Sequence, residues 1–205
     1  MSGSSYCRTE LSSPWGLEIP ARDSASFHVI VSGYAWLRAG GEPILLEEGD
    51  LVLLPHGRGH FLGDLPHSPT VRIDAMRHRK IGQGASVLRH GGKGKRAMII
   101  CGGVKFEEPV YHPLLELMPE ALLIRGEAGR SEKWVQNTIE MMALEVKTPR
   151  PGAPTVITRL TDILVIQAVR AWLEQSTADT GWVSAVRDPH VGRAIALIHR
   201  ADPSR

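Results

Sequence analysis

The stretch GDLVLLPHGRGH, residues 49–60, decides the fold of this chain. Its apolar run LVLL starts directly after a Gly-Asp pair and ends at a Pro-x-Gly break, which is typical of a buried strand between two turns. Two histidines, His56 and His60, follow in that break. They could finish a turn, catalyse a reaction or hold a metal, and the rest of the chain has to decide between these roles.

The first half of the chain carries further short strands. Its apolar runs alternate with Gly, Pro and Asp at close intervals, and GGEP at residues 40–43 supplies the turn of a hairpin. Many short strands without helices between them are typical of a barrel or sandwich. Residues 67–95, rich in Arg, Lys, His and Gly, are predicted to form an exposed loop before the strand AMIICGGVKF returns to the core.

Helical periodicity begins after residue 109. The segment LLELMPEALLI is helix-prone but interrupted by Pro119, and SEKWVQNTIEMMALEV is predicted to form a helix with Ser131 as its N-cap. A long helix is expected over residues 155–175, with apolar residues on most of its sides. Because such a helix needs covering, we expect a homodimer.

Composition excludes several classes of protein. With 205 residues, 42% hydrophobic content and a net charge of +2, the chain is expected to fold as a globular protein and lacks the basic excess of nucleic-acid binders. Its two cysteines are too few for a disulfide framework, which favours a reducing cytoplasm. No leader segment and no apolar run of about 20 residues is present, so export or membrane insertion is not predicted.

The spacing of Gly49, Pro55, Gly57 and His60 resembles the second motif of the cupin superfamily of small β-barrels, whose terminal histidine points into the barrel. The resemblance implies a cupin-like double-stranded β-helix, or jelly roll. The usual metal ligands of the first cupin motif are missing. If the glycine of that motif is Gly33, its two histidines and glutamate are replaced by Pro20, Arg22 and Ser26.

Another histidine can take part in a site inside this barrel. His28 stands two residues beyond Ser26, and strand alternation keeps it on the same inward face. If Cys101 also faces the cavity, then His28, His60 and Cys101 offer the mixed nitrogen and sulfur ligands that zinc or nickel accepts. The plainer interpretation is two hydrogen-bonded core histidines and a buried structural thiol.

An effector pocket is the second site predicted in the barrel. Trp15 and Trp36 are interpreted either as core residues or as walls of a small-molecule pocket. His56, in the rim bend, is expected to shape the loop or contact the effector. The residues assigned to this effector pocket are Trp15, His28, Trp36, His56 and His60.

Six segments in order, from RTELSSPWG through GDLVLLPHGRGH to GWVSAVRDPHVGRAIALIH, resemble the cupin-type sensor half of bacterial AraC-family transcription regulators. The resemblance implies a sensor barrel (residues 6–108), a helical dimerisation section (109–186) and a linker with the first helix of a helix-turn-helix domain (187–205). No recognition helix follows His199. We therefore expect a shortened chain whose relatives contact DNA through the missing domain.

Three functions follow from these patterns. The favoured one is the effector-sensing and dimerisation part of an AraC-type regulator, which is not an enzyme. A metal-dependent cupin enzyme acting on a small metabolite is the alternative, although a catalytic metal generally needs three protein ligands and the first-motif set is missing. A dimerisation module without an effector is the third, because a filled barrel and an empty one have similar sequences.

Overall fold

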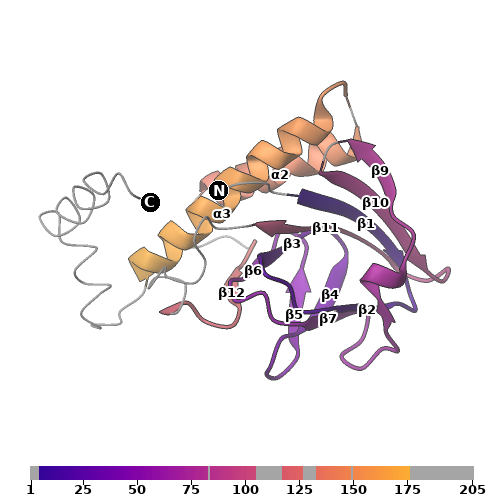
Figure 1. The fold of residues 1–205 in the computed structure, drawn as a ribbon. Coiled ribbons are helices and arrows are strands. Elements are labelled where there is room, and N and C mark those ends of the chain that lie inside the picture. The colour runs from indigo at the N-terminus through magenta and orange to yellow at the C-terminus, as the bar shows by residue number, and fades with distance from the viewer. Residues whose placement is uncertain (1–4, 83, 105–116, 127–132, 149, 176–205) are drawn as a thin grey trace, which may run out of the picture. The chain divides into compact units, whose positions relative to one another are not determined.

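The structure is a computed structural model that describes residues 5–82, 84–104, 117–126, 133–148 and 150–175. Two facing β-sheets form most of it, and two helices lie beside one of them (Figure 1). The larger sheet has seven strands in the order β12-β6-β3-β11-β1-β10-β9 and the smaller has five in the order β5-β4-β7-β2-β8. The described strands therefore form two separate sheets, and the predicted class, mainly β with α, is confirmed.

The elements of the larger sheet are β1 (Ser5–Ser12), β3 (Ala25–Ser32), β6 (Leu51–Leu54), β9 (Arg79–Gly82), β10 (Ala85–Gly91), β11 (Arg96–Val104) and β12 (Leu122–Ile124). Those of the smaller sheet are β2 (Gly16–Ile19), β4 (Tyr34–Arg38), β5 (Ile44–Glu47), β7 (His60–Gly63) and β8 (Val71–Arg72). A short 3-10 helix, η1 (Ile73–Ala75), follows β8. The helices are α2 (Lys133–Lys147) and α3 (Ala153–Gln175).

The opening motif forms the predicted strand and turns. Its apolar run is β6, and Gly49 and Gly57 have φ angles of +90° and +63°, which side-chain-bearing residues rarely adopt. A Cβ atom on Gly57 would also collide with the carbonyl oxygens of Arg22 and Ser24. The glycine therefore lets the β6–β7 connection pass directly over the chain segment that precedes β3. The hairpin predicted at GGEP is confirmed, since β4 pairs with β5 around it.

Two segments differ from their prediction. Residues 67–95 were expected to form an exposed loop, but they include β10, which pairs in parallel with β1 and buries Val87 and Leu88. Residues 122–124, in a helix-prone run, form β12 on the edge of β6. In both cases pairing with a strand distant in sequence outweighs local composition, and Pro119 prevents a helix from continuing through the second segment.

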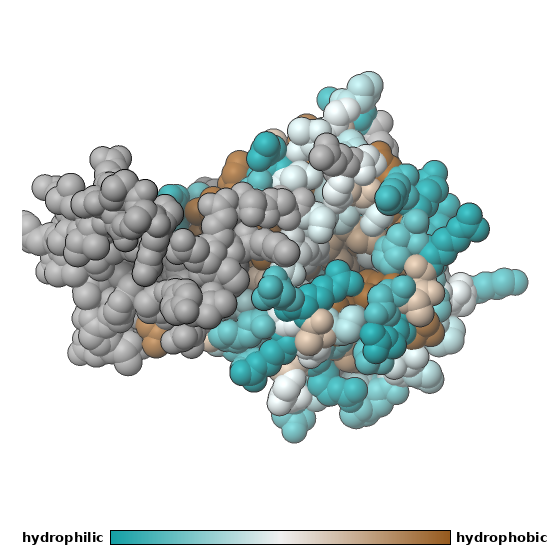
Figure 2. Space-filling view, in the orientation of Figure 1, coloured by the Kyte–Doolittle hydropathy of each residue, from teal (hydrophilic) through white to brown (hydrophobic). Residues whose placement is uncertain are grey.

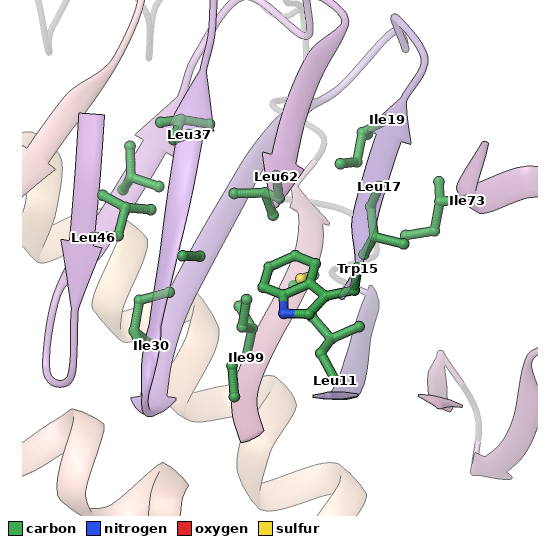
Figure 3. Close-up of a cluster of buried hydrophobic side chains, with 14 of the residues drawn as sticks. Leu11, Trp15, Leu17, Ile19, Ile30, Leu37, Leu46, Leu62, Ile73 and Ile99 are labelled. Carbon is green, nitrogen blue, oxygen red and sulfur yellow. The ribbon is translucent and has the colours of Figure 1, made fainter. Parts of the chain in front are cut away.

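Large apolar side chains fill one part of the space between the sheets (Figure 3). They come from strands of both sheets and surround the indole of Trp15, which is 3% exposed. The buried side chains labelled in Figure 3 are Leu11, Trp15, Leu17, Ile19, Ile30, Leu37, Leu46, Leu62, Ile73 and Ile99. Hydrophilic residues cover most of the described surface seen in Figure 2.

Part of the outer face of the larger sheet is also buried, around β3. Phe27 and Val29, which alternate with His28 along β3, are fully buried on that face, and α2 lies against β3. The guanidinium Nη1 of Arg8 donates a hydrogen bond to the carbonyl oxygen of Val146, 2.9 Å away, and so ties β1 to the end of α2.

The two helices agree with the predicted periodicity. In α2, Ile139, Met142 and Val146 are buried, and in α3 the buried residues include Ile157, Leu160, Leu164 and Ala168. The chain divides into two compact units, residues 1–168 and 169–205. The predicted N-cap Ser131 and the last predicted helix, at 187–199, lie outside the described residues. No described helix is long and apolar enough to cross a membrane.

Candidate functional site

A row of polar side chains crosses the inner face of the larger sheet. Residues that are direct partners on neighbouring strands lie on the same face of a sheet. The strand register therefore aligns one residue from each of β9, β10, β1, β11 and β3. We call this the polar row: Lys80, Ser86, Cys7, Cys101 and His28.

The rows on the two sides of the polar row are very different. On one side the partners on β1, β11 and β3 are Thr9, Ile99 and Ile30, which belong to or adjoin the apolar core. On the other side the partners are Ser5, Gly103 and Ser26. These small residues leave the space above the sheet unfilled.

A cavity of about 520 Å³ occupies that space. Its volume is in the range of small-molecule sites in proteins. The polar row lines it together with hydroxyl-bearing and glycine residues, and Ile19 and Ile73 separate it from the apolar core. The other lining residues include Ser5, Tyr6, Arg22, Ser26, His78, Gly102 and Gly103.

His28 and His60 form a hydrogen-bonded pair at the edge of the cavity. Their Nε2 atoms are 2.7 Å apart and their ring planes are inclined by 63°. Nδ1 of His60 lies 3.2 Å from the carbonyl oxygen of Arg58, which can only accept a hydrogen bond, so this nitrogen carries the proton of a neutral imidazole. Nε2 of His60 is then an acceptor, and Nε2–H of His28 donates to it.

This assignment leaves one buried nitrogen without a partner. Nδ1 of His28 has no hydrogen-bond partner among the described residues, although the side chain is only 2% exposed. Because Nε2 of the same neutral ring carries the proton, Nδ1 is an acceptor. A buried polar atom without a partner costs about 1–3 kcal/mol, so this nitrogen is a buried acceptor whose hydrogen-bonding capacity is unused.

Burial keeps both imidazoles neutral. The pKa of His28 is well below its usual value of 6.5, first because of burial and second because of the neighbouring His60. The pKa of His60 is also lowered, mainly by burial and partly by the positive charge of Arg22, although the hydrogen bond to Arg58 opposes the shift. Both rings are therefore available as uncharged hydrogen-bonding groups near pH 7.

Two thiols lie side by side in the polar row. The Thr9 hydroxyl is 3.6 Å from Sγ of Cys101 and 3.7 Å from Sγ of Cys7. Burial raises the pKa of the Cys101 thiol to about 12, so this thiol stays protonated. Cys7 is half-buried and its sulfur lies 3.7 Å from Nδ1 of His78, at the more accessible part of the cavity.

The structure brings together part of the predicted metal set. His28 and His60 are in direct contact, and Cys101 is the Cα partner of His28 on the neighbouring strand. Within the described ranges, however, no three His, Cys, Asp or Glu side chains are grouped so that they could hold a metal ion. The metal itself therefore stays a prediction.

The other predicted pocket residues lie elsewhere. Trp15 belongs to the apolar core, and Trp36 alternates with the inward-facing Ala35 and Leu37, so its side chain is on the opposite face of β4. His56 lies 3.0 Å from the carbonyl oxygen of Met118 through its Nε2 atom and shapes the rim. None of these three residues lines the cavity, and His60 borders it only through its contact with His28.

The residues of the cavity that sequence reasoning missed include its charged and reactive ones: Cys7, Arg22, His78 and Lys80. Cys7 alternates with Thr9 and Leu11, so the period of β1 already placed it on the inner face. His78 and Lys80 fell in the segment interpreted as a loop. No pattern in the nearby sequence shows that these residues meet Cys7. They do so because β9 pairs with β10 and β10 pairs with the distant β1.

Comparison with known proteins finds a matching family and several similar regulators. A family model described as cupin matches residues 1–174. The HTH-type transcriptional regulator AlkR of Acinetobacter baylyi is 24% identical over 97% of this chain and 66% of its own length. A putative AraC-like transcription regulator of Streptomyces lividans is 27% identical over 93% of this chain and 62% of its own length. The chain thus spans slightly less than two thirds of these relatives.

Proposed function

Because the chain belongs to the cupin family, we propose that its two-sheet domain senses a small-molecule effector as part of an AraC-type transcription regulator. The observation that carries the proposal is the cavity of about 520 Å³ that is lined by a buried imidazole with an unpartnered nitrogen. The names of the relatives, which are regulators, favour binding over catalysis. DNA contact would belong to a helix-turn-helix domain of the kind for which AlkR is named, acting in the cytoplasm.

A chain of hydrogen bonds can carry the signal away from the cavity. An effector that donates to Nδ1 of His28 polarises the bond from His28 to His60, and the latter holds the carbonyl of Arg58 in the β6–β7 connection. This connection also touches the segment before β12, through the Arg58–Glu120 ion pair of 2.8 Å and the bond between His56 and Met118. Effector binding would therefore alter the contacts that hold the segment before β12, which leads towards the helices.

A thermal-shift screen with a metabolite panel tests the sensor proposal. A ligand that binds only the folded chain raises its stability according to its concentration relative to Kd, by about 2.7 kcal/mol at a hundredfold excess. We expect at least one metabolite to raise the Tm of the wild type, and His28→Phe to abolish the shift. His56→Gln, outside the cavity lining, is the matched control and should keep it. A ligand that raises the Tm of His28→Phe as much as that of the wild type would contradict the assigned site.

We also propose that the helices form the interface of a homodimer. Met141 and Leu144 of α2 are 54% and 53% exposed, and Ile163 of α3 is 47% exposed. Exposed apolar side chains on two consecutive helices are typical of a surface that a second copy covers. Light scattering after size exclusion should give twice the chain mass for the wild type. Ile163→Glu should give the monomer mass with unchanged circular dichroism, and a monomeric wild type would contradict the proposal.

A metal ion at the histidine pair is the second candidate ligand. It is favoured by the neutral state of both imidazoles, because metal binding requires unprotonated nitrogen. Cys101 would have to complete the ligand set from the neighbouring strand. Elemental analysis of protein purified without a metal-affinity tag distinguishes a metal-bound histidine pair from a hydrogen-bonded one. About one zinc or nickel ion per chain, lost in His60→Ala, supports the metal, and substoichiometric metal supports the hydrogen-bonded pair.

A further inference from the structure

The permanent charges of the described cavity lining are all of one sign. Of the described residues that line it, Arg22 and Lys80 carry permanent positive charge near pH 7, and none is Asp or Glu. The remaining polar lining consists of hydroxyls, thiols, imidazoles and backbone groups. A cavity with this lining has a positive potential that no neighbouring carboxylate within the described lining compensates.

Neither cation is engaged elsewhere within the described ranges. The ion pairs found there involve Arg8, Arg58, Arg72, Arg89, Arg125 and Arg159. Arg22 is anchored by its backbone, whose N–H donates to the carbonyl oxygen of Gly57 at 2.8 Å, so its side chain starts from a fixed point. Its positive charge is close enough to His60 to contribute to the lowering of the pKa of that residue.

Lys80 approaches the cavity from the opposite direction. It is the Cα partner of Ser86 and therefore the first residue of the polar row, which ends at His28. A ligand that lies along this row meets Lys80 near one end and the His28 imidazole near the other. The cations and the imidazole thus border the same space from different strands.

We propose that the effector is a small organic anion, a carboxylate or phosphate ester, that lies along the polar row between Arg22, near the histidine pair, and Lys80, at the other end. This inference rests on the proposed sensor function and names the chemical class of its ligand. Guanidinium and ammonium groups both recognise carboxylate and phosphate oxygens. Both residues are exposed, so their charged groups are accessible to such an anion, whereas they would repel a cationic effector.

Cys7 allows a test that does not require the natural effector. Iodoacetate and iodoacetamide alkylate thiolates by the same displacement: a carbon–sulfur bond forms, the carbon–iodine bond breaks and iodide leaves. The two reagents are similar in size and differ in charge. The ratio of their rates at Cys7, measured by peptide mass spectrometry, therefore reports whether the cavity favours an anion. The urea-unfolded chain supplies the reference ratio, which includes the effect of the neighbouring Arg8.

We expect the iodoacetate to iodoacetamide ratio at Cys7 to be at least threefold higher in the folded chain than in the unfolded chain. The double variant Arg22→Gln/Lys80→Gln should return it to the reference. Lys95→Gln, a lysine outside the cavity lining, is the matched control and should leave the ratio high. A folded ratio at or below the reference, or one that the double variant does not change, would overturn the anion assignment while leaving a neutral effector possible.

The same experiment separates failure of the ligand class from failure of the sensor proposal. If both reagents label Cys7 in the unfolded chain but neither labels it in the folded chain, the cavity is closed to small molecules. That result would overturn the proposed function together with the inference. Labelling by both reagents without an anion preference would overturn the inference alone.

Discussion

The inner face of the larger sheet has two ends that follow the same strand period but differ in content. At one end Ile30, Ile99 and Leu11 point between the sheets and pack around Trp15 (Figure 3). At the other end the same strands place Ser26, Gly103 and Ser5 on the same face. From the pair Ile99 and Ile30 to the pair Gly103 and Ser26, β11 and β3 keep one register. Only the size and polarity of the inward residues change.

This difference separates what stabilises the fold from what recognises a ligand. Apolar side chains that fill the space contribute burial and close packing. Small and polar side chains leave an opening and contribute hydrogen-bonding groups, at the cost of an unpartnered nitrogen on His28. If this division is correct, substitutions at the two ends have effects of very different size.

The largest effect is expected at the packed end. Ile30→Ala removes a fully buried side chain from the core and leaves a void, so the free energy of unfolding should fall by roughly 2–5 kcal/mol. Urea unfolding followed by circular dichroism measures the change. Ser26→Ala, on the same strand and face, is the matched control and should lower it by less than about 1 kcal/mol. Equal losses at both positions would remove the distinction between the two ends.

Two consecutive glycines give the next largest contrast. A Cβ atom on Gly102 would collide with the buried Phe27 ring and lie 2.5 Å from the carbonyl oxygen of Ser5. A Cβ atom on Gly103 would meet only the Ser24 hydroxyl, at 3.3 Å, and the Ala25 carbonyl oxygen, at 3.8 Å. Gly102→Ala should therefore lower the free energy of unfolding by about 2 kcal/mol or more.

Gly103→Ala is the internal control for that pair, because its methyl group enters the side of the sheet that borders the cavity. It should change the free energy of unfolding by less than about 1 kcal/mol. Similar losses for both alanines in urea unfolding would show that the inner face is packed as tightly as the outer face.

The histidine pair predicts an effect that depends on pH. Both imidazoles have a lowered pKa in the folded chain, so the unfolded chain binds protons more readily once the pH falls below about 6.5. The free energy of unfolding should be constant above that pH. At pH 5.5 it should be lower by up to about 1.4 kcal/mol for each histidine.

Urea unfolding between pH 5.5 and 8 measures this dependence, and His28→Leu/His60→Leu should flatten it. A titration of the histidine ring signals by NMR gives an independent check that does not need the variant. Protonation of either ring at or above pH 6.5 would contradict the assignment of a neutral pair.

Much of the fold, but only a small part of the candidate site, was predictable from the sequence. The Gly-Pro-Gly-His spacing predicted the strand β6 and the turn that follows it, and strand alternation correctly predicted that His28 faces inward. Alternation along one strand cannot show which strands become neighbours. β9 pairs with β10, and Lys80 and His78 reach the cavity only because β10 pairs with the distant β1. In the same way, β12 forms because β6 offers an edge. These contacts join residues far apart in the chain, so local composition indicated a loop and a helix instead.

The most direct test of the two-ended inner face is the free energy of unfolding of Ser26→Leu, measured in urea beside the wild type. Ser26 is 7% exposed and its side chain lines the cavity. The added side chain should enter open space, so we expect the free energy of unfolding to change by less than about 1 kcal/mol. A loss of about 3 kcal/mol, as overpacking of a filled core produces, would contradict the account, because it would show that no ligand-sized space exists at this end of the sheet.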